Sequence, residues 1–428
     1  MSYRRHAEVK PANAPWIDKI PAHWDERPFY AVGKERRAKN IGMKEDNLLS
    51  LSYGNIVRKD INTPNGLLPE SFETYQIVEP DDVVFRLTDL QNDKRSLRSA
   101  ICLERGIITS AYLAVRSESV LPGFMNYLMR AYDVQKVFYS MGGGLRQSLG
   151  FEDLRRMSIV APDPDEQAAI VAFLDRETGL IDGLIEKKIR FIALLKEKRA
   201  AVITHAVTNG IDPDAPMKHS GVDWLGRVPA HWEVLRIAAL FREASRPADP
   251  ALPVLSVSIH DGVTDGELAD EDRDRKVALS EDRTKYQGVA PGDLVYNMMR
   301  AWQGAFGAVT VKGLVSPAYV VAAPVTTFRT KFIEHLLHTK SAAEEIRRFS
   351  RGIADFRMRL YWDHFRALKV CLPPLAEQDR ILSEIDTETA RIDGLISLTE
   401  RSIDLLREKR AALITAAVTG KIDVRAAA

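Results

Sequence analysis

Two polar segments of the sequence hold side chains that are suited to binding the edges of nucleic-acid bases. Residues 86–98 follow a predicted strand that ends at Phe85, and residues 297–304 follow a predicted strand that ends at Tyr296. Arginine can donate two hydrogen bonds to guanine, and asparagine or glutamine can bind adenine in a similar way. These residue types predict recognition of a base sequence rather than bond making. The candidate contact residues are Arg86, Thr88, Gln91, Asn92, Lys94, Arg95 and Arg98 in the first segment, Asn297, Arg300, Trp302 and Gln303 in the second, and Tyr53, Asn55, Arg146 and Arg357 elsewhere.

A separate cluster of basic residues, Lys34, Arg36, Arg37 and Lys39, has the composition of a phosphate-contacting patch. A charged loop is more often ordinary solvated surface. The position of the two polar segments favours the binding interpretation. The chain is internally duplicated, as described below, and these segments are places where the two copies differ.

The sequence lacks the motifs of common catalytic centres. It has no Gly-x-x-x-x-Gly-Lys-Ser/Thr phosphate loop, no His-Glu-x-x-His, no Gly-x-Ser-x-Gly and no Asn-Pro-Pro-aromatic motif of adenine methyltransferases. The glycine run 142–144 lacks the lysine of a phosphate loop and predicts a turn. Glu8 and Lys10 have the letters of a nuclease centre but precede the duplicated part. Two cysteines, Cys102 and Cys371, cannot form a four-cysteine zinc site. We therefore expect no catalytic residue, metal site or cofactor in this chain.

Length and composition indicate a multidomain globular protein. The 428 residues predict two to four domains, and 45% hydrophobic with 28% charged residues is ordinary for folded chains. A net charge of +1 argues against a uniformly basic binder of nucleic acid but leaves room for a local basic surface. No run of about 18 apolar residues and no secretory leader is found, so we expect a cytoplasmic protein.

One stretch of the sequence occurs twice, and the rest of the chain is organised around it. Residues 166–212 and 377–423 align without gaps and are identical at 27 of 47 positions. Each copy predicts a helix of about 40 residues, roughly 60 Å long. Residues at alternating steps of four and three form a heptad seam, so the two copies are natural partners for each other. The seam positions of the second copy are Ile392, Ile396, Thr399, Ile403, Leu406, Arg410, Leu413 and Ala417.

The repeat extends beyond the helices. Residues 16–24 and 224–232 both end in Pro-Ala-His-Trp, which we interpret as a packing motif because two tryptophans bury a large area. Each copy is therefore a mixed α/β globule of about 150 residues followed by a helix. A linker rich in proline and polar residues, 213–221, marks the boundary between the copies.

The combination of motifs resembles the DNA specificity subunits of type I restriction-modification systems, over nearly the whole chain. The resemblance rests on Trp224-Leu225-Gly226, Pro229, His231-Trp232, Gly292-Asp293-Leu294-Val295, Ser316-Pro317-Ala318-Tyr319, and Pro-x-x-x-Glu-Gln leading into Ile-Asp-Gly-Leu-Ile and Glu-Lys-Arg in both helices. The first copy departs from the pattern, with Asp82-Val83-Val84 lacking the glycine and Trp16-Ile17-Asp18 in place of Trp-Leu-Gly.

The resemblance implies an α+β fold with two mixed α/β target-recognition domains in tandem, each followed by a long α-helix. The helices are expected to pack as an antiparallel coiled coil with pseudo-twofold symmetry. It implies target-recognition domain 1 at 1–161, a central conserved helical region at 162–212, target-recognition domain 2 at 213–372 and a distal conserved helical region at 373–428. Each domain would bind one half of a split double-stranded DNA target, and the helices would set the spacer.

The resemblance also implies partners. Two methyltransferase subunits that use S-adenosylmethionine would dock on the helices, and motor-nuclease subunits that use ATP and magnesium would complete the complex. None of these cofactors is expected to bind this chain.

Three other interpretations stay open from the sequence. The chain could be the specificity subunit of a system whose restriction and methylation activities are fused in one partner chain. It could be a coiled-coil scaffold for proteins without DNA binding. A nuclease or methyltransferase acting alone is disfavoured by the missing motifs. At the seam, Arg199 and Arg410 are expected to bury their stems and keep their charges outside, rather than to form a buried pair between the helices.

Overall fold

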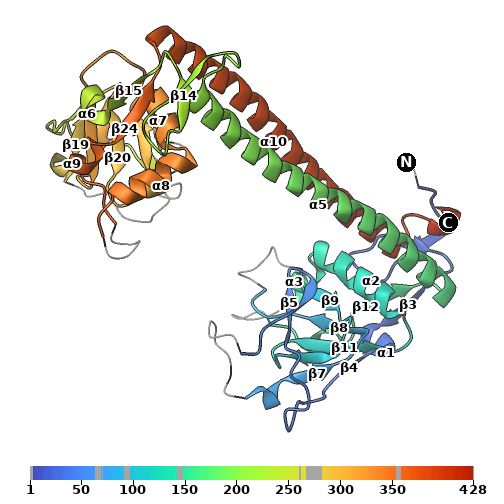
Figure 1. The fold of residues 1–428 in the computed structure, drawn as a ribbon. Helices are drawn as coiled ribbons and strands as arrows, with labels where there is room; N and C mark the ends of the chain where they lie inside the picture. The colour runs from blue at the N-terminus through green and yellow to red at the C-terminus, as the bar shows by residue number, and fades with distance from the viewer. Residues whose placement is uncertain are drawn as a thin grey trace. The chain divides into compact units, whose positions relative to one another are not determined.

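The chain folds into two compact units (Figure 1). The computed structural model describes residues 3–62, 69, 71–90, 97–141, 148–259, 262–266, 282–352 and 358–427. Unit 1 consists of residues 1–189 and 400–428, and unit 2 of residues 190–399. Each unit thus combines one globule, the first part of the helix that follows it, and the last part of the other helix.

Unit 1 is built on a four-stranded antiparallel sheet of order β4-β11-β8-β9. Strand β8 (Asp82–Phe85) is buried along its whole length because the sheet is covered on both faces. On one face Val83 and Phe85 pack in a core with helix α2 (Pro122–Val134), and on the other Val84 joins a smaller cluster. The remaining elements are β1 (Val9–Pro11), β2 (Lys19–Pro21), β3 (Asp25–Pro28), α1 (Phe29–Val32), β4 (Gly33–Glu35), β5 (Leu49–Ser52), β6 (Asn55–Arg58), η1 (Phe72–Thr74), β7 (Gln76–Val78), β9 (Ser99–Ile101), β10 (Gly106–Ile108), β11 (Leu113–Ser117), α3 (Val137–Met141), α4 (Phe151–Leu154) and β12 (Ser158–Ala161).

Unit 2 repeats this plan with the sheet order β16-β23-β20-β21, again antiparallel. Helix α7 (Thr330–Leu337) follows the sheet as α2 does in unit 1. The repeat of the sequence is therefore a repeat of topology. The other elements are β13 (Met217–His219), β14 (Arg227–Pro229), β15 (Glu233–Arg236), α6 (Ile237–Leu240), β16 (Phe241–Glu243), β17 (Val257–Ser258), β18 (Gly262–Val263), η2 (Arg283–Lys285), β19 (Gln287–Val289), β20 (Leu294–Asn297), η3 (Ala301–Gln303), β21 (Phe306–Ala308), β22 (Gly313–Val315), β23 (Tyr319–Pro324), α8 (Lys340–Phe349), α9 (Trp362–Phe365), β24 (Lys369–Leu372) and, in unit 1, η5 (Val424–Ala427).

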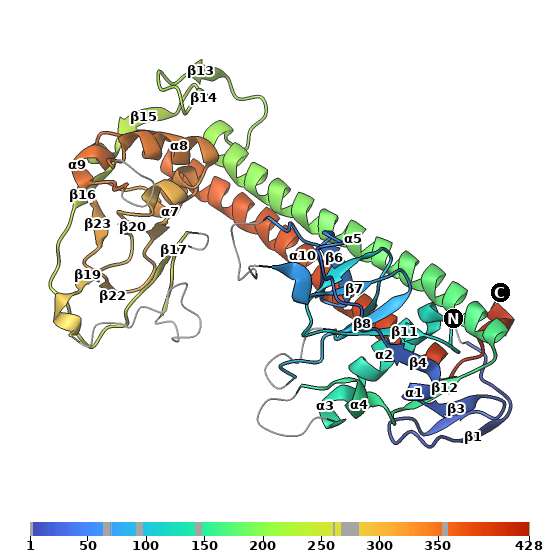
Figure 2. The same ribbon diagram turned by 90° about the horizontal axis from the view of Figure 1, so that it is seen from below.

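The duplicated stretches form two long helices, α5 (Pro164–Asn209) and α10 (Leu375–Val418), which Figures 1 and 2 show side by side. Their lengths of 46 and 44 residues correspond to about 70 Å and 65 Å. In unit 1 the start of α5 meets the end of α10, since Glu166 lies 3.8 Å from Arg425 and Asp182 2.8 Å from Arg410. The helices of unit 1 are therefore antiparallel.

The same direction holds within unit 2. Arg199 lies 3.0 Å from Asp393, and Cys371, which precedes α10, donates from Sγ to the Val207 carbonyl near the end of α5. The predicted fold of two mixed globules with long helices packed antiparallel is confirmed. None of the described helices is long and apolar enough to span a membrane.

The seam arginines do not lie simply in solvent. Arg410 donates from Nε to both carboxylate oxygens of Asp182, and Arg199 makes the same pair of bonds with Asp393. All four side chains keep contact with water, so these are ion pairs between helices at the surface. As expected, the two arginines do not form a buried pair. Each arginine instead binds an aspartate of the other helix, an interaction that the sequence did not predict.

Each long helix is fixed to its globule by the same set of side chains. The predicted packing motif is confirmed, because Trp24 and Trp232 are fully buried. In unit 1 the Trp24 indole donates to Glu166 Oε1 at 3.3 Å, and His23 bonds Glu166 Oε2 at 2.7 Å. In unit 2, Trp232 and His231 bond Glu377 at 3.0 and 2.6 Å. We call each Trp-His-Glu set the anchor of its unit.

In each unit, the glutamine after the anchor glutamate binds the backbone just before the helix that follows the sheet. Gln167 accepts from the Leu121 amide just before α2, and Gln378 accepts from the Arg329 amide just before α7. The start of α5 is capped by Asp163, whose carboxylate accepts from the Glu166 amide at 3.0 Å. Asp165, the next acidic residue, lies inside the first turn because the helix begins at Pro164.

The two helix ends allow a matched test of packing. Gly210 and Gly420 have φ of +78° and +69°, a conformation in which any side chain is strained. A Cβ on Gly210 would meet its nearest atom at 3.5 Å, whereas a Cβ on Gly420 would overlap the Pro21 ring, lying 2.5 Å from Cγ.

We expect Gly210→Ala to destabilise the protein by about 1–2 kcal/mol from backbone strain alone. Gly420→Ala is expected to cost about 1–3 kcal/mol more, because overlap with Pro21 adds to the same strain. Urea unfolding of the full chain would measure both losses. Equal losses would show that Pro21 moves aside freely.

Candidate nucleic-acid interface

Tyr53 and Asn55 lie at the tip of a tight hairpin in unit 1. Strands β5 and β6 pair with Ser52 opposite Asn55, which leaves Tyr53 and Gly54 as a two-residue turn. Their φ values of +46° and +77° fit the turn that matches strand twist. Tyr53 is 74% exposed and Asn55 is exposed. The fold therefore presents an aromatic ring and an amide to solvent, as base contacts require.

The first polar segment is divided by the structure. Arg86 and Thr88 follow β8 and are half-buried. Predicted contact residues Gln91, Asn92, Lys94, Arg95, Arg146 and Arg357 lie outside the described residues.

Arg98 does not fit the predicted direct contact, because its side chain is fully buried. Its guanidinium donates to the Thr88 and Asp89 carbonyls at 3.1 and 3.4 Å and to the Tyr139 hydroxyl at 3.3 Å. Its backbone amide donates to Asp133 at 2.6 Å. Arg98 therefore holds the backbone of residues 88–89 in place. Polar composition suggested an exposed side chain, whereas carbonyls brought near by the fold enclose it.

In unit 2 the structure brings the predicted residues together at one turn. Asn297 ends β20 and accepts from the Met299 amide through Oδ1 at 3.0 Å. Arg300 donates to Gln303 Oε1 at 3.2 Å, and Gln303 is exposed. The Trp302 ring is half-buried beneath the Arg347 guanidinium, 5.3 Å from the ring centre. This turn places amide and guanidinium groups at the surface.

The predicted phosphate patch is largely neutralised within unit 1. Lys34 lies 2.8 Å from Glu118, and Arg37 lies 2.6 Å from Glu35. Arg36 binds buried Asp82. The last pair is structural, since Arg246 binds Asp293 at the matching place in unit 2. Of the four basic residues, Lys39 is exposed without an ion pair among the described groups.

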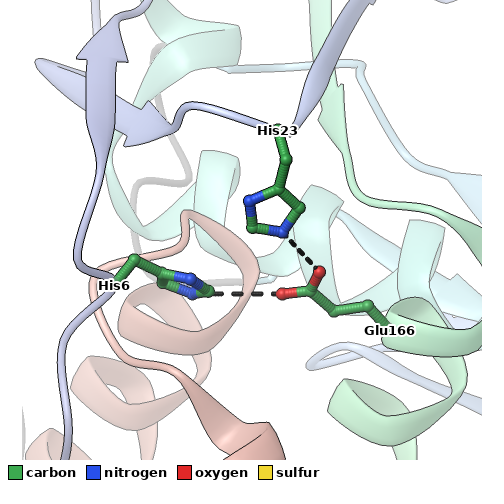
Figure 3. Close-up of side chains that lie close together, drawn as sticks. All are labelled: His6, His23 and Glu166. Carbon is green, nitrogen blue, oxygen red and sulfur yellow. Dashed lines mark hydrogen bonds and ion pairs between the residues drawn. The ribbon is translucent and has the colours of Figure 1, made fainter.

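One group of side chains has a composition that could hold a metal ion. His6, His23 and Glu166 offer ligand atoms within 4.8 Å of one another, and Figure 3 shows both rings beside the carboxylate. Burial lowers the pKa of His6, which favours its neutral, ligand-competent form. Against metal binding, Glu166 already accepts from Trp24, and the Arg425 guanidinium lies 3.8 Å away. The arrangement is that of the anchor, with His6 added.

Three arginines outside the predicted contact set lie beside the β5–β6 hairpin. Arg130 of α2 and Arg407 and Arg410 of α10 line a pocket of about 600 Å³ together with Tyr53 and Asn55. The sequence predicts Arg410 as a seam residue and not as a ligand contact. Arg130 gave no signal in the sequence, because it lies within the apolar pattern of a helix.

Comparisons with known proteins support the fold. No protein-family model matches the sequence, and no curated protein matches it. A chain solved in work on complex assembly and conformational transition of the type I R-M system is similar, with a TM-score of 0.66 and 14% identity over 94% of this chain and 99% of that one. The HsdS subunit from Thermoanaerobacter tengcongensis has a TM-score of 0.50 and 15% identity over 94% and 98%. The resemblance to specificity subunits therefore holds at the level of the fold (Figure 1).

Proposed function

Because the chain has the fold of a type I specificity subunit, we propose that it selects the DNA target of a restriction-modification complex without a catalytic centre of its own. Residues 1–161 and 213–372 act as target-recognition domains, each binding one half of a split target. The helical regions 162–212 and 373–428 set the spacer between the halves. The complex works in the cytoplasm.

The observation that carries this proposal is the contrast between a repeated framework and unlike exposed turns. Both units share the anchor and the sheet order, down to the glutamine contact that precedes α2 or α7. After the matching strands β8 and β20 the side chains differ, with the half-buried Arg86 and Thr88 in unit 1 and with Arg300 and the exposed Gln303 in unit 2. Two domains that share a framework but differ in these side chains can bind two different half-sites. A scaffold for proteins alone would not need this contrast.

Base contacts are assigned to exposed and half-exposed residues of these turns. Tyr53, Asn55, Arg86 and Thr88 serve unit 1, and Asn297, Arg300, Trp302 and Gln303 serve unit 2. Gln91, Asn92, Lys94, Arg95, Arg146 and Arg357 stay in the proposed set on their composition and place in the repeat. Arg98 acts through the backbone that it holds, and not by contact.

The long helices supply the docking surface for the methyltransferase subunits. Leu180 and Leu184 of α5 are 67% and 43% exposed in unit 1. In unit 2, Leu194 of α5 and Leu398 of α10 are 55% and 58% exposed. Large apolar side chains left in water along a helix favour a protein partner. S-adenosylmethionine would bind the methyltransferase subunits, and ATP with magnesium the motor-nuclease subunits.

The test is a methylation map. Expressing the chain with its neighbouring methyltransferase in a host that lacks other adenine methylation should produce methylated adenines in one split motif, two short half-sites separated by a fixed spacer. Expression of the methyltransferase alone is the control and should leave the motif unmethylated. A continuous short palindrome, or the same pattern without this chain, would contradict the proposal.

A further inference from the structure

The pocket beside the β5–β6 hairpin has the lining of an anion site. It lies wholly within unit 1, between the hairpin, helix α2, the first part of α5 and the end of α10. Arg130, Arg407 and Arg410 line it, and Asp182 is the one carboxylate among the lining residues. With Asp404, which pairs with Arg407 from outside the lining, three guanidinium groups face two carboxylates, and a surplus of positive charge remains. Such a surplus favours a phosphate group, which guanidinium can bind with two hydrogen bonds.

Arg130 is held in a position that suits this use. Its guanidinium donates to the Gly54 carbonyl at 2.6 Å, which ties it to the hairpin turn. Its Nε is buried and has no hydrogen-bond partner among the described residues. Burial, and then the nearby Arg410 charge, lower the pKa of Arg130. An anion in the pocket would offset both costs, since it would bring an opposite charge and an acceptor.

The other two arginines differ in how firmly they are engaged. Arg410 is fixed by its ion pair with Asp182 and has 28% of its side chain exposed. Arg407 is 61% exposed and lies 3.1 Å from Asp404, one turn away on the same helix. An ion pair this exposed contributes little, so Arg407 can exchange Asp404 for a ligand at small cost.

Among the described residues, unit 2 keeps basic residues at two of these three positions, since Arg407 and Arg410 correspond to Lys196 and Arg199 in α5, but it differs at the third. Counted from the matching glutamine contacts at Leu121 and Arg329, the position equivalent to Arg130 is His338. Burial lowers the pKa of His338, and its Nε2 lies 3.1 Å from the Phe306 carbonyl. The buried arginine that is tied to the hairpin turn is therefore specific to unit 1, whereas the two basic positions on the long helix recur in both units.

We propose that this pocket binds a phosphodiester of the DNA backbone, with Arg130 and Arg407 as its contacts, and so places unit 1 on its half-site. The inference rests on the proposed function, because it assigns the ligand from the neighbouring Tyr53 and Asn55. A phosphate held here fixes the position of the hairpin along the backbone. The hairpin side chains can then meet base edges in a defined register.

The experiment measures binding of the full chain, assembled with its methyltransferase subunits, to two labelled duplexes. One duplex carries the mapped target, and the other carries the same bases in scrambled order. Dissociation constants are measured over a series of salt concentrations. The variants are Arg130→Gln, Arg407→Gln and Arg130→Lys, with Arg155→Gln as a charge-matched control. Arg155 is an exposed arginine of unit 1 that pairs with Glu152 outside the pocket.

Losing one phosphate contact should weaken binding to both duplexes by about tenfold and reduce the slope of log affinity against log salt by about 0.9. Arg130→Gln and Arg407→Gln should each show this, with the preference for the target unchanged. Arg130→Lys should keep most of the slope because it keeps the charge, and Arg155→Gln should behave as the unaltered protein. Because Arg407 is exposed, its variant tests the proposal even where Arg130→Gln fails to fold.

The failures are distinguishable. If the unaltered complex binds target and scrambled duplexes equally, the proposed function is wrong. If it prefers the target but Arg130→Gln and Arg407→Gln match Arg155→Gln, the phosphate site is wrong and the function stands. Loss of target preference with an unchanged salt slope would also overturn the inference, since it would indicate contact with bases.

Discussion

Deleting one heptad from each long helix is expected to abolish methylation at the present target and move it to a target with a shorter spacer. Residues 189–195 of α5 and 397–403 of α10 are opposite each other in the register that both interhelical ion pairs share. Removing them shortens the helices by about 10 Å, which is the rise of about three base pairs. The seam keeps its heptad spacing, so the helices can still pair.

The expected loss of affinity for the original target is at least a hundredfold, because one half-site can no longer be reached and specific binding commonly exceeds non-specific binding by about a thousandfold or more. A methylation map of cells with the deletion variant gives the new motif directly. The control replaces residues 189–195 by the sequence of residues 400–406, which keeps the length and should keep the spacer. An unchanged spacer after the paired deletion would show that the helices do not set it.

Truncating the anchor tryptophans should unfold one unit at a time. We expect Trp24→Ala to destabilise unit 1 and Trp232→Ala to destabilise unit 2, each by about 3–5 kcal/mol, because each removes a fully buried ring. Each change also takes away the indole donor of a buried glutamate, Glu166 or Glu377. Limited proteolysis with mass spectrometry would show which unit is cut first, and urea unfolding would measure the loss.

The control for these two variants is Tyr53→Ala, which removes an aromatic ring that is 74% exposed and should change stability by less than about 0.5 kcal/mol. The two tryptophan variants should give complementary cleavage patterns. If both produced the same pattern, the anchors would stabilise the whole chain and not their own units.

The helices and the repeated globules could be predicted from the sequence because their signals are local and occur twice. A heptad seam needs only the spacing of residues such as Ile392 and Ile396, and the near-identical second copy identifies its partner. The buried tryptophans followed from residue type and the surrounding prolines. Periodicity and duplication together therefore specify the framework, without any knowledge of distant contacts.

The candidate site was harder to predict because exposure depends on contacts far apart in the sequence. Arg86 and Arg98 look alike in a polar segment, yet Arg86 is half-buried, whereas Arg98 is fully buried and enclosed by carbonyls and by Tyr139. Arg130 looks like one polar residue of an amphipathic helix, and only the fold places it against Gly54 and near Arg410. The anchors were predictable in part. His23 and Glu166 both recur in the second copy, but no local pattern indicated that their side chains are in contact.

The exchange of helix segments between the units has a consequence for synthesis. Unit 1 needs residues 400–428, which leave the ribosome 211 residues after residue 189. At a synthesis rate of about 5–20 residues per second, roughly 10–40 s pass between the emergence of the first globule and that of the α10 segment that completes unit 1. During this time Ile181 and Leu174, buried in the finished unit, lack the cover that α10 gives, and aggregation competes with folding. The nascent chain therefore stays vulnerable until residues 400–428 have emerged, and a chaperone would have its greatest effect on yield during that interval.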